Sequence, residues 1–129
     1  MDINAFTQKS QQAILSARKS AENRNHQAVQ PFHLLDGLLG QTDTIVYPLL
    51  GHLHINPTTI RNATESGLAS VPQVYGDTGE LAFAPATLTV LETADSIRAG
   101  MGDQYVSIEH LLLALATSDD PVGDRKSVV

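Results

Sequence analysis

The chain contains no cysteine, which excludes disulfides, thiolate catalysis and thiolate zinc sites together. This absence fits the cytoplasm, which is the location we expect. No run of about 18 apolar residues occurs, and the amino terminus lacks the basic and apolar regions of a signal peptide. We therefore expect neither secretion nor insertion into a membrane.

Basic runs are also missing, because 8 lysines and arginines stand against 14 aspartates and glutamates and give a net charge of −6. This balance disfavours binding to a phosphate backbone, so we expect no nucleic-acid partner. The motifs G-x-x-x-x-G-K-[ST], G-x-G-x-x-G, H-E-x-x-H and G-x-S-x-G do not occur. The sequence therefore indicates a binding module without a cofactor rather than an enzyme.

What the sequence does contain is a repeated segment. "AVQPFHLLDGLL" at 28–39 returns as "YVSIEHLLLALA" at 105–116, and the two histidines, His33 and His110, lie 110 − 33 = 77 positions apart. The same offset aligns, without a gap, Phe6 with Phe83, Ala17 with Ala94, Gln27 with Gln104, Val29 with Val106, Leu34 with Leu111, Leu35 with Leu112 and Leu38 with Leu115. A constant offset over this length indicates a tandem repeat whose two copies close one core.

Each copy has the periodicity of helices. In the first copy, small and apolar residues recur at steps of three and four between Ser10 and Ala21, which predicts a helix over about 7–23. The features that predict the helix starts are Thr7 as an N-cap, Pro31 in a first turn, Pro48 in a first turn or at a kink, and Asn56 as an N-cap before a helix that ends near Gly67.

The second copy repeats this scheme after a connector rich in proline and glycine. Pro85 starts a helix that ends near Gly100 and Gly102, and Ser107 caps the next one. We predict an all-α fold of two pseudo-twofold four-helix repeats, in a single domain over 1–129. Repeat one covers 1–70, the connector covers 71–84 and repeat two covers 85–129. Repeat two is incomplete, because its fourth helix would lie beyond the last residue.

The repeated histidine has two interpretations. His33 and His110 could form a symmetric metal or acid–base pair, with Glu109, His52 and His54 as helpers, which would describe a metal-dependent enzyme. Alternatively, each histidine is the third residue of its helix and reaches back to the exposed backbone at the helix start. A structural role that duplicates with the fold favours the second interpretation, so we predict no metal site.

Several segments together resemble a known family. "FTQKSQQAILSARKSA", "PFHLLDGLL", "VPQVYG" and "DQYVSIEHLLLAL" are similar to the Clp N-terminal repeat domain, especially in its protein-disaggregating branch, and the resemblance covers nearly the whole chain. The family implies an all-α pseudo-twofold domain, tethered flexibly to a hexameric AAA+ ATPase body. Such a domain captures unfolded or aggregated polypeptide and helps to pass it to the pore.

The resemblance also implies site residues. Polar positions that the disaggregating branch uses for substrate engagement match Thr7, Asp103 and Glu109, and we expect these three to flank one surface. Each also has a plain structural explanation, as an N-cap, a cap at a loop end and a solvated carboxylate at a helix start. Candidate apolar contacts are Leu91, Ile97 and Tyr105, although for Leu91 a place in the core is the better interpretation.

The end of the chain departs from the family pattern. Where paired leucines are due, the sequence has "DDPVGDRKSVV", so part of the second core is expected to be exposed or covered by a neighbouring molecule. The leading hypothesis is a non-catalytic module that captures substrate. The alternative is a stand-alone adaptor or scaffold that docks a folded partner.

Overall fold

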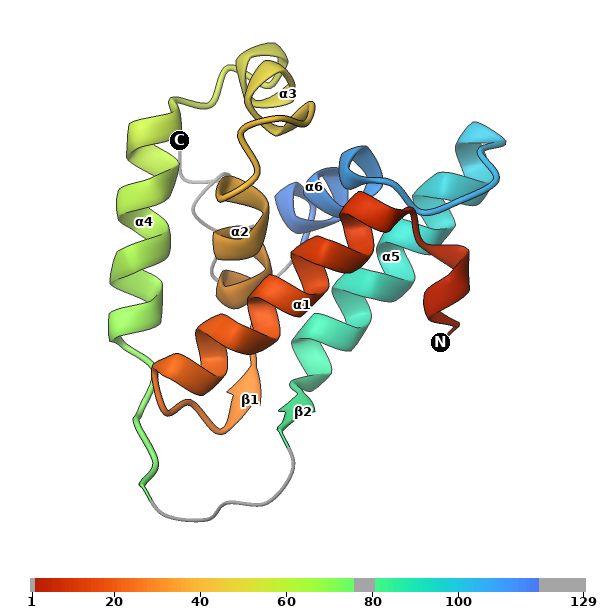
Figure 1. The fold of residues 1–129 in the computed structure, drawn as a ribbon. Coiled ribbons are helices and arrows are strands. Elements are labelled where there is room, and N and C mark those ends of the chain that lie inside the picture. Colours follow the sequence, from red (N-terminus) through yellow and green to blue (C-terminus); the bar gives the residue numbers. More distant parts are fainter. Residues whose placement is uncertain (1, 76–80, 119–129) are drawn as a thin grey trace.

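The computed structural model describes residues 2–75 and 81–118, and these form a mostly helical fold (Figure 1). The elements in chain order are the 3-10 turn η1 (Ile3–Ala5), α1 (Gln8–Asn23), β1 (Ala28–Val29), α2 (Pro31–Leu39), α3 (Val46–His52), α4 (Pro57–Ala69), β2 (Ala82–Phe83), α5 (Pro85–Met101) and α6 (Ile108–Ala116). The helical fold class expected from the periodicity is confirmed. The helices that would complete the second copy, and the unusual tail, lie outside the described residues.

The helix starts follow the local signals in the sequence. The Thr7 hydroxyl accepts a hydrogen bond from the amide of Ser10 at 3.2 Å, and the Asn56 side chain accepts from two amides of α4. Pro31, Pro57 and Pro85 occupy first-turn positions, where a missing N–H breaks no helical bond. The fourth helix, predicted to end near Gly67, ends at Ala69.

The first helices of the two copies end in the same way. Asn25 after α1 and Gly102 after α5 both adopt the left-handed backbone, with φ of 58° and 74°. The next residue of each copy then bonds back to the carbonyl five positions earlier, His26 N to Ala21 O at 2.9 Å and Asp103 N to Arg98 O at 3.1 Å. This is the helix-ending motif in which glycine is the usual residue and asparagine the common substitute.

Backbone contacts between the copies show the twofold relationship most directly. Val29 of β1 pairs with Phe83 of β2 in parallel, and Phe6 pairs with Val106 in an isolated parallel bridge. The offset of 77 converts one pair into the other, so each copy supplies the same two positions. β2 lies near the end of the predicted connector 71–84, where the sequence did not predict a strand. Strands of two residues are too short to produce an alternating pattern in a sequence.

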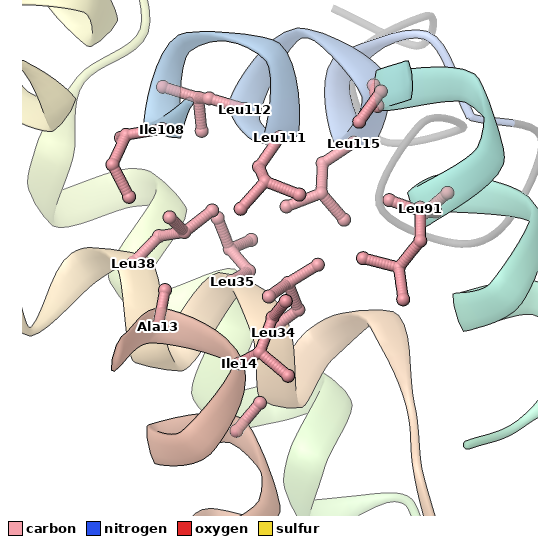
Figure 2. Close-up of a cluster of buried hydrophobic side chains, with 14 of the residues drawn as sticks. Ala13, Ile14, Leu34, Leu35, Leu38, Leu91, Ile108, Leu111, Leu112 and Leu115 are labelled. Carbon is pink, nitrogen blue, oxygen red and sulfur yellow. The ribbon is translucent and has the colours of Figure 1, made fainter. Parts of the chain in front are cut away.

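The core lies where α2 and α6 face each other, with α1 packed on α2 and α5 packed on α6. Figure 2 shows leucines of α2, among them Leu34 and Leu38, directed toward Leu111 and Leu115 of α6. All four of these leucines are buried. Because both repeats bury the same leucine pattern, the duplicated "HLL" segments form the centre of one shared core.

Candidate functional site

The start of α1 lies directly beside the loop that precedes α6. The amide of Thr7 donates to the carbonyl of Val106 at 2.9 Å, and the amide of Val106 donates to Ala5 of η1 at 2.8 Å. Thr7 therefore stands next to the segment 103–109 that carries the other two polar candidates (Figure 1). Its side chain also caps α1 and bonds the hydroxyl of Ser10 at 2.9 Å, so this residue has a structural role of its own.

Asp103 is held by its neighbours rather than being free in solvent. Its carboxylate accepts a hydrogen bond from Nε2 of His110 at 2.8 Å, and its carbonyl accepts from Arg98 at 2.9 Å. The carboxylate side chain is still 49% exposed, so it is available to a partner as well. The sequence interpretation of Asp103 as a simple loop-end cap missed this bond to His110.

The orientation of His110 explains why this bond forms. The ring is only 1% exposed, and its Nδ1 accepts from the backbone amide of Ser107 at 2.8 Å. Because Nδ1 is the acceptor, the ring proton is on Nε2 and points at Asp103. The predicted backbone-capping role of His110 is therefore confirmed, with a second bond to the carboxylate added to it.

The remaining candidates divide into surface and core. Tyr105 is 46% exposed in the same loop, and Glu109 is half-buried in the first turn of α6. Ile97 is also half-buried and packs against the core from α5. Leu91 is 5% exposed and points into the leucine cluster of Figure 2, so it is a core residue and offers no free surface to a partner.

Two further apolar side chains are exposed on elements that join this region. Ile3 of η1 is 46% exposed and Met101 at the end of α5 is 49% exposed. Sequence reasoning did not select either residue, because a single exposed apolar side chain has no periodic signal. Ile3, Met101 and Tyr105 are thus exposed apolar side chains on the elements that adjoin the Thr7–Val106 contact. The same region also carries the carboxylates of Asp103 and Glu109.

His33 has the same capping role in the first copy but a different partner. Its Nδ1 accepts from the amide of Gln30 at 2.7 Å, and its Nε2 lies 2.7 Å from Nδ1 of His26. Burial, with the charges of His26 and Arg24 adding to it, lowers the pKa of His33 from the ordinary 6.5 to about 4. Burial is also the main cause that lowers the pKa of His26, followed by Arg24.

The two repeated histidines thus belong to separate caps, each with its own partner, and not to one composite site. Among residues 2–75 and 81–118, no three histidine, aspartate or glutamate side chains converge as metal ligands would. Within the same described ranges, no helix is both long and apolar enough to cross a bilayer.

The fold is that of a helical repeat domain whose two copies meet through paired backbone bridges. The family model for the Clp repeat N-terminal domain matches residues 5–125, and the chain belongs to that family. It is 34% identical over 123 residues to the chaperone protein ClpB of Mycobacterium tuberculosis, covering 95% of this chain and 14% of the relative. The chain therefore spans about a seventh of the length of that relative.

Solved structures show the same fold. The Hsp104 N-terminal domain from Candida albicans matches with a TM-score of 0.79 and 22% identity, over 92% of this chain and 77% of that one. A complex of the ClpV N-domain with a VipB peptide matches with a TM-score of 0.72 and 20% identity, over 89% of this chain and 69% of that one. At these identities the two structures support the fold alone.

Proposed function

We propose that this domain is the non-catalytic substrate-binding module of a cytoplasmic, ClpB-type disaggregating ATPase and that it captures unfolded or aggregated polypeptide. The AAA+ modules of the same chain, assembled as a hexamer, would then receive what it captures. The similarity to ClpB over 95% of the chain supports this choice among the members of the family.

The observation that carries the proposal is the contact between the start of α1 and the 103–109 segment. It brings the backbone of Thr7 beside the loop of Asp103 and Tyr105, and we infer that these polar groups and the exposed ring of Tyr105 form one mixed edge of the domain. A mixed edge of this kind suits an extended chain that presents both apolar side chains and backbone amides. The edge is small and its partner is heterogeneous, so we expect dissociation constants of roughly micromolar to millimolar.

Fluorescence anisotropy tests the proposal, with a labelled model protein offered to the domain in its unfolded and its folded form. We expect binding to the unfolded form only, weakened by Glu109→Ala. The matched control is Glu22→Ala, which removes an exposed carboxylate near the opposite end of α1. Equal binding of the folded and unfolded forms would contradict capture of unfolded chains.

A second candidate function is a stand-alone adaptor that docks a defined segment of a folded protein. The ClpV N-domain, which shares this fold, has been solved with a VipB peptide, and that supports recognition of one particular segment. The same anisotropy experiment separates the two functions, because an adaptor would bind one sequence tightly and ignore unrelated unfolded proteins.

A further inference from the structure

The turn between α1 and α2, residues 24–30, holds both ends of the connector. At one end, the amide of Val74 donates to the carbonyl of Asn25 at 2.8 Å. At the other, the carbonyl of Val29 accepts from the amide of Ala84 at 3.0 Å and from the hydroxyl of Thr87 at 2.6 Å. The 24–30 turn is therefore the segment of the first copy that binds the connector and the second copy, through the pairing of β1 with β2.

A pair of buried histidines fixes this turn onto α2. His26 is 6% exposed and His33 is 0% exposed, and Nδ1 of the first lies 2.7 Å from Nε2 of the second. Since the amide of Gln30 donates to Nδ1 of His33, the proton of that neutral ring is on Nε2. The bond therefore runs in one direction, from His33 Nε2–H to the lone pair of His26 Nδ1.

Neither of the two facing imidazole rings can take up a proton at Nδ1 without losing a hydrogen bond that this nitrogen accepts. A proton on Nδ1 of His26 would point at the N–H of His33, and a proton on Nδ1 of His33 would point at the N–H of Gln30. Either event replaces a hydrogen bond with two facing donors inside a buried site, which is the costly outcome for a polar group. Opening the turn removes that conflict, because the exposed rings can then accept protons from water.

The surrounding charges add to the effect. Arg24 at the end of α1 acts on both rings and is paired with Glu65 of α4 at 3.0 Å, while Asp36 of α2 accepts from a serine of α1. β2 carries no charged residue, and Arg18 of α1 lies over its phenylalanine at 5.9 Å. Within the described parts of the chain, no carboxylate bonds either imidazole to compensate a positive charge.

The second copy has a carboxylate at the equivalent position. His26 and Asp103 are 77 positions apart, as are His33 and His110, so each histidine cap has a partner from the same place in its repeat. The Asp103 carboxylate accepts from Nε2–H of His110 whether that ring is neutral or charged. Nδ1 of the cap histidine accepts a backbone amide in both copies, so the copies differ only in the partner of Nε2. A positive charge on the cap would have an attractive partner, the Asp103 carboxylate, only in the second copy.

We propose that the His26–His33 pair is a proton-sensitive latch: acidification to about pH 5 opens the 24–30 turn and releases the connector from the first copy. The other bridge between the copies, Phe6–Val106, stays closed over the same range. The latch goes beyond substrate capture, since it controls how tightly the two copies are joined and does not involve the Thr7 and Asp103 edge.

Nuclear magnetic resonance on the 129-residue chain tests the latch between pH 7.5 and 4.5. The first signal is the cross-strand contact between Val29 and Phe83, together with exchange protection of the Val74 and Ala84 amides. The second is the contact between Phe6 and Val106, which serves as an internal control. We expect the first to disappear on acidification with at least about a tenfold loss of protection, while the second remains.

The variant His26→Asn sharpens the test, because its Oδ1 occupies the place of Nδ1 and accepts the same bond but does not titrate. We expect it to keep the Val29–Phe83 contact at least about one pH unit further into acid than the parent chain. Should it not fold, His26→Asp answers the same question, since it installs the residue type of the second copy. His52→Asn, at an exposed histidine of α3, is the matched control and should change nothing.

Three outcomes would overturn the latch. Loss of both bridges at one pH would indicate global acid unfolding, and persistence of both to pH 4.5 would show that the turn does not open. An unshifted loss of the Val29–Phe83 contact in the His26 variants would show that another group is responsible.

Discussion

Gly37 lies so close to α1 that a methyl group added to it would stand 2.6 Å from the carbonyl oxygen of Ala13. The backbones of α1 and α2 therefore meet at this point without any side chain between them. The equivalent residue of the second copy is Ala114 of α6, whose methyl group is fully buried. α5 and α6 thus accommodate a methyl group that α1 and α2 do not, and the two copies differ in how closely their helices pack.

Gly37→Ala should destabilise the domain by about 1–3 kcal/mol, because the new methyl group forces two packed helices apart. The matched control is Gly100→Ala in α5, where an added methyl group meets nothing within 4 Å. That variant should gain about 0.5–1 kcal/mol from its higher helix propensity. Urea denaturation measures both, and a Gly37 variant as stable as the parent would show that the helices separate at little cost.

His33→Ala and His110→Ala should each lower the free energy of unfolding by about 1–3 kcal/mol, because each ring is buried and accepts a backbone amide. Thermal unfolding followed by circular dichroism measures the loss. An exposed histidine of α3, His52, provides the control as His52→Ala. Unchanged melting of both buried variants would refute the capping role of the repeated histidine.

Substitutions of Asp103 and of Glu109 should differ in their effect on the stability of the domain, which the sequence alone did not indicate. Asp103→Ala leaves Nε2–H of buried His110 without its acceptor, at a cost of about 1–3 kcal/mol. Glu109→Ala should change stability by less, about 0.5 kcal/mol, because the half-buried Glu109 has only the favourable charge of a helix start to lose. Asp103→Asn is the better probe of function, because it keeps an acceptor oxygen and removes only the charge. Equal melting of Asp103→Ala and the parent would contradict the bond.

Capture of aggregated substrate is the functional counterpart of that experiment. In a full-length ATPase that carries this domain, Thr7→Ala, Asp103→Asn and Glu109→Ala should together reduce reactivation of an aggregated reporter while basal ATP hydrolysis persists. Melting of the isolated domain is measured alongside, so that a loss of fold is not mistaken for a loss of binding. If the variants melt like the parent and reactivate the reporter like the parent, these residues serve only as structural caps and do not bind substrate.

Stability should fall on acidification because of His33. Its pKa is about 4 in the folded chain against an ordinary 6.5, so between these values the unfolded chain binds a proton that the folded chain excludes. Stability is therefore complete above about pH 6.5 and declines as the pH falls toward 5, where the latch opens, by roughly 2 kcal/mol at about 1.4 kcal/mol per pKa unit. Urea midpoints across this range measure the decline. His33→Ala should flatten the curve, and an equally steep curve would assign the effect elsewhere.

The helices, their starts and the shared leucine core follow from local signals such as Thr7, Pro31 and Ser107, and those predictions are confirmed. The contacts between the copies do not follow from any local signal, because β1 and β2 are two residues long and are paired across the connector. The bond from His110 to Asp103 could have been predicted from the offset of 77 between the repeats. The offset aligns Asp103 with His26, the two residues that partner the repeated histidine.

The reciprocal bridges have a consequence for how such a fold is assembled. Phe6 of one copy meets Val106 of the other, and Phe83 meets Val29, so the two contacts are those that a symmetric homodimer of single repeats would make across an isologous interface. The connector replaces that bimolecular encounter with an intramolecular one, at an effective concentration in the millimolar range for a short tether. Each copy thus acts as a protomer toward the other. Because both are in one chain, their association does not weaken when the protein is diluted.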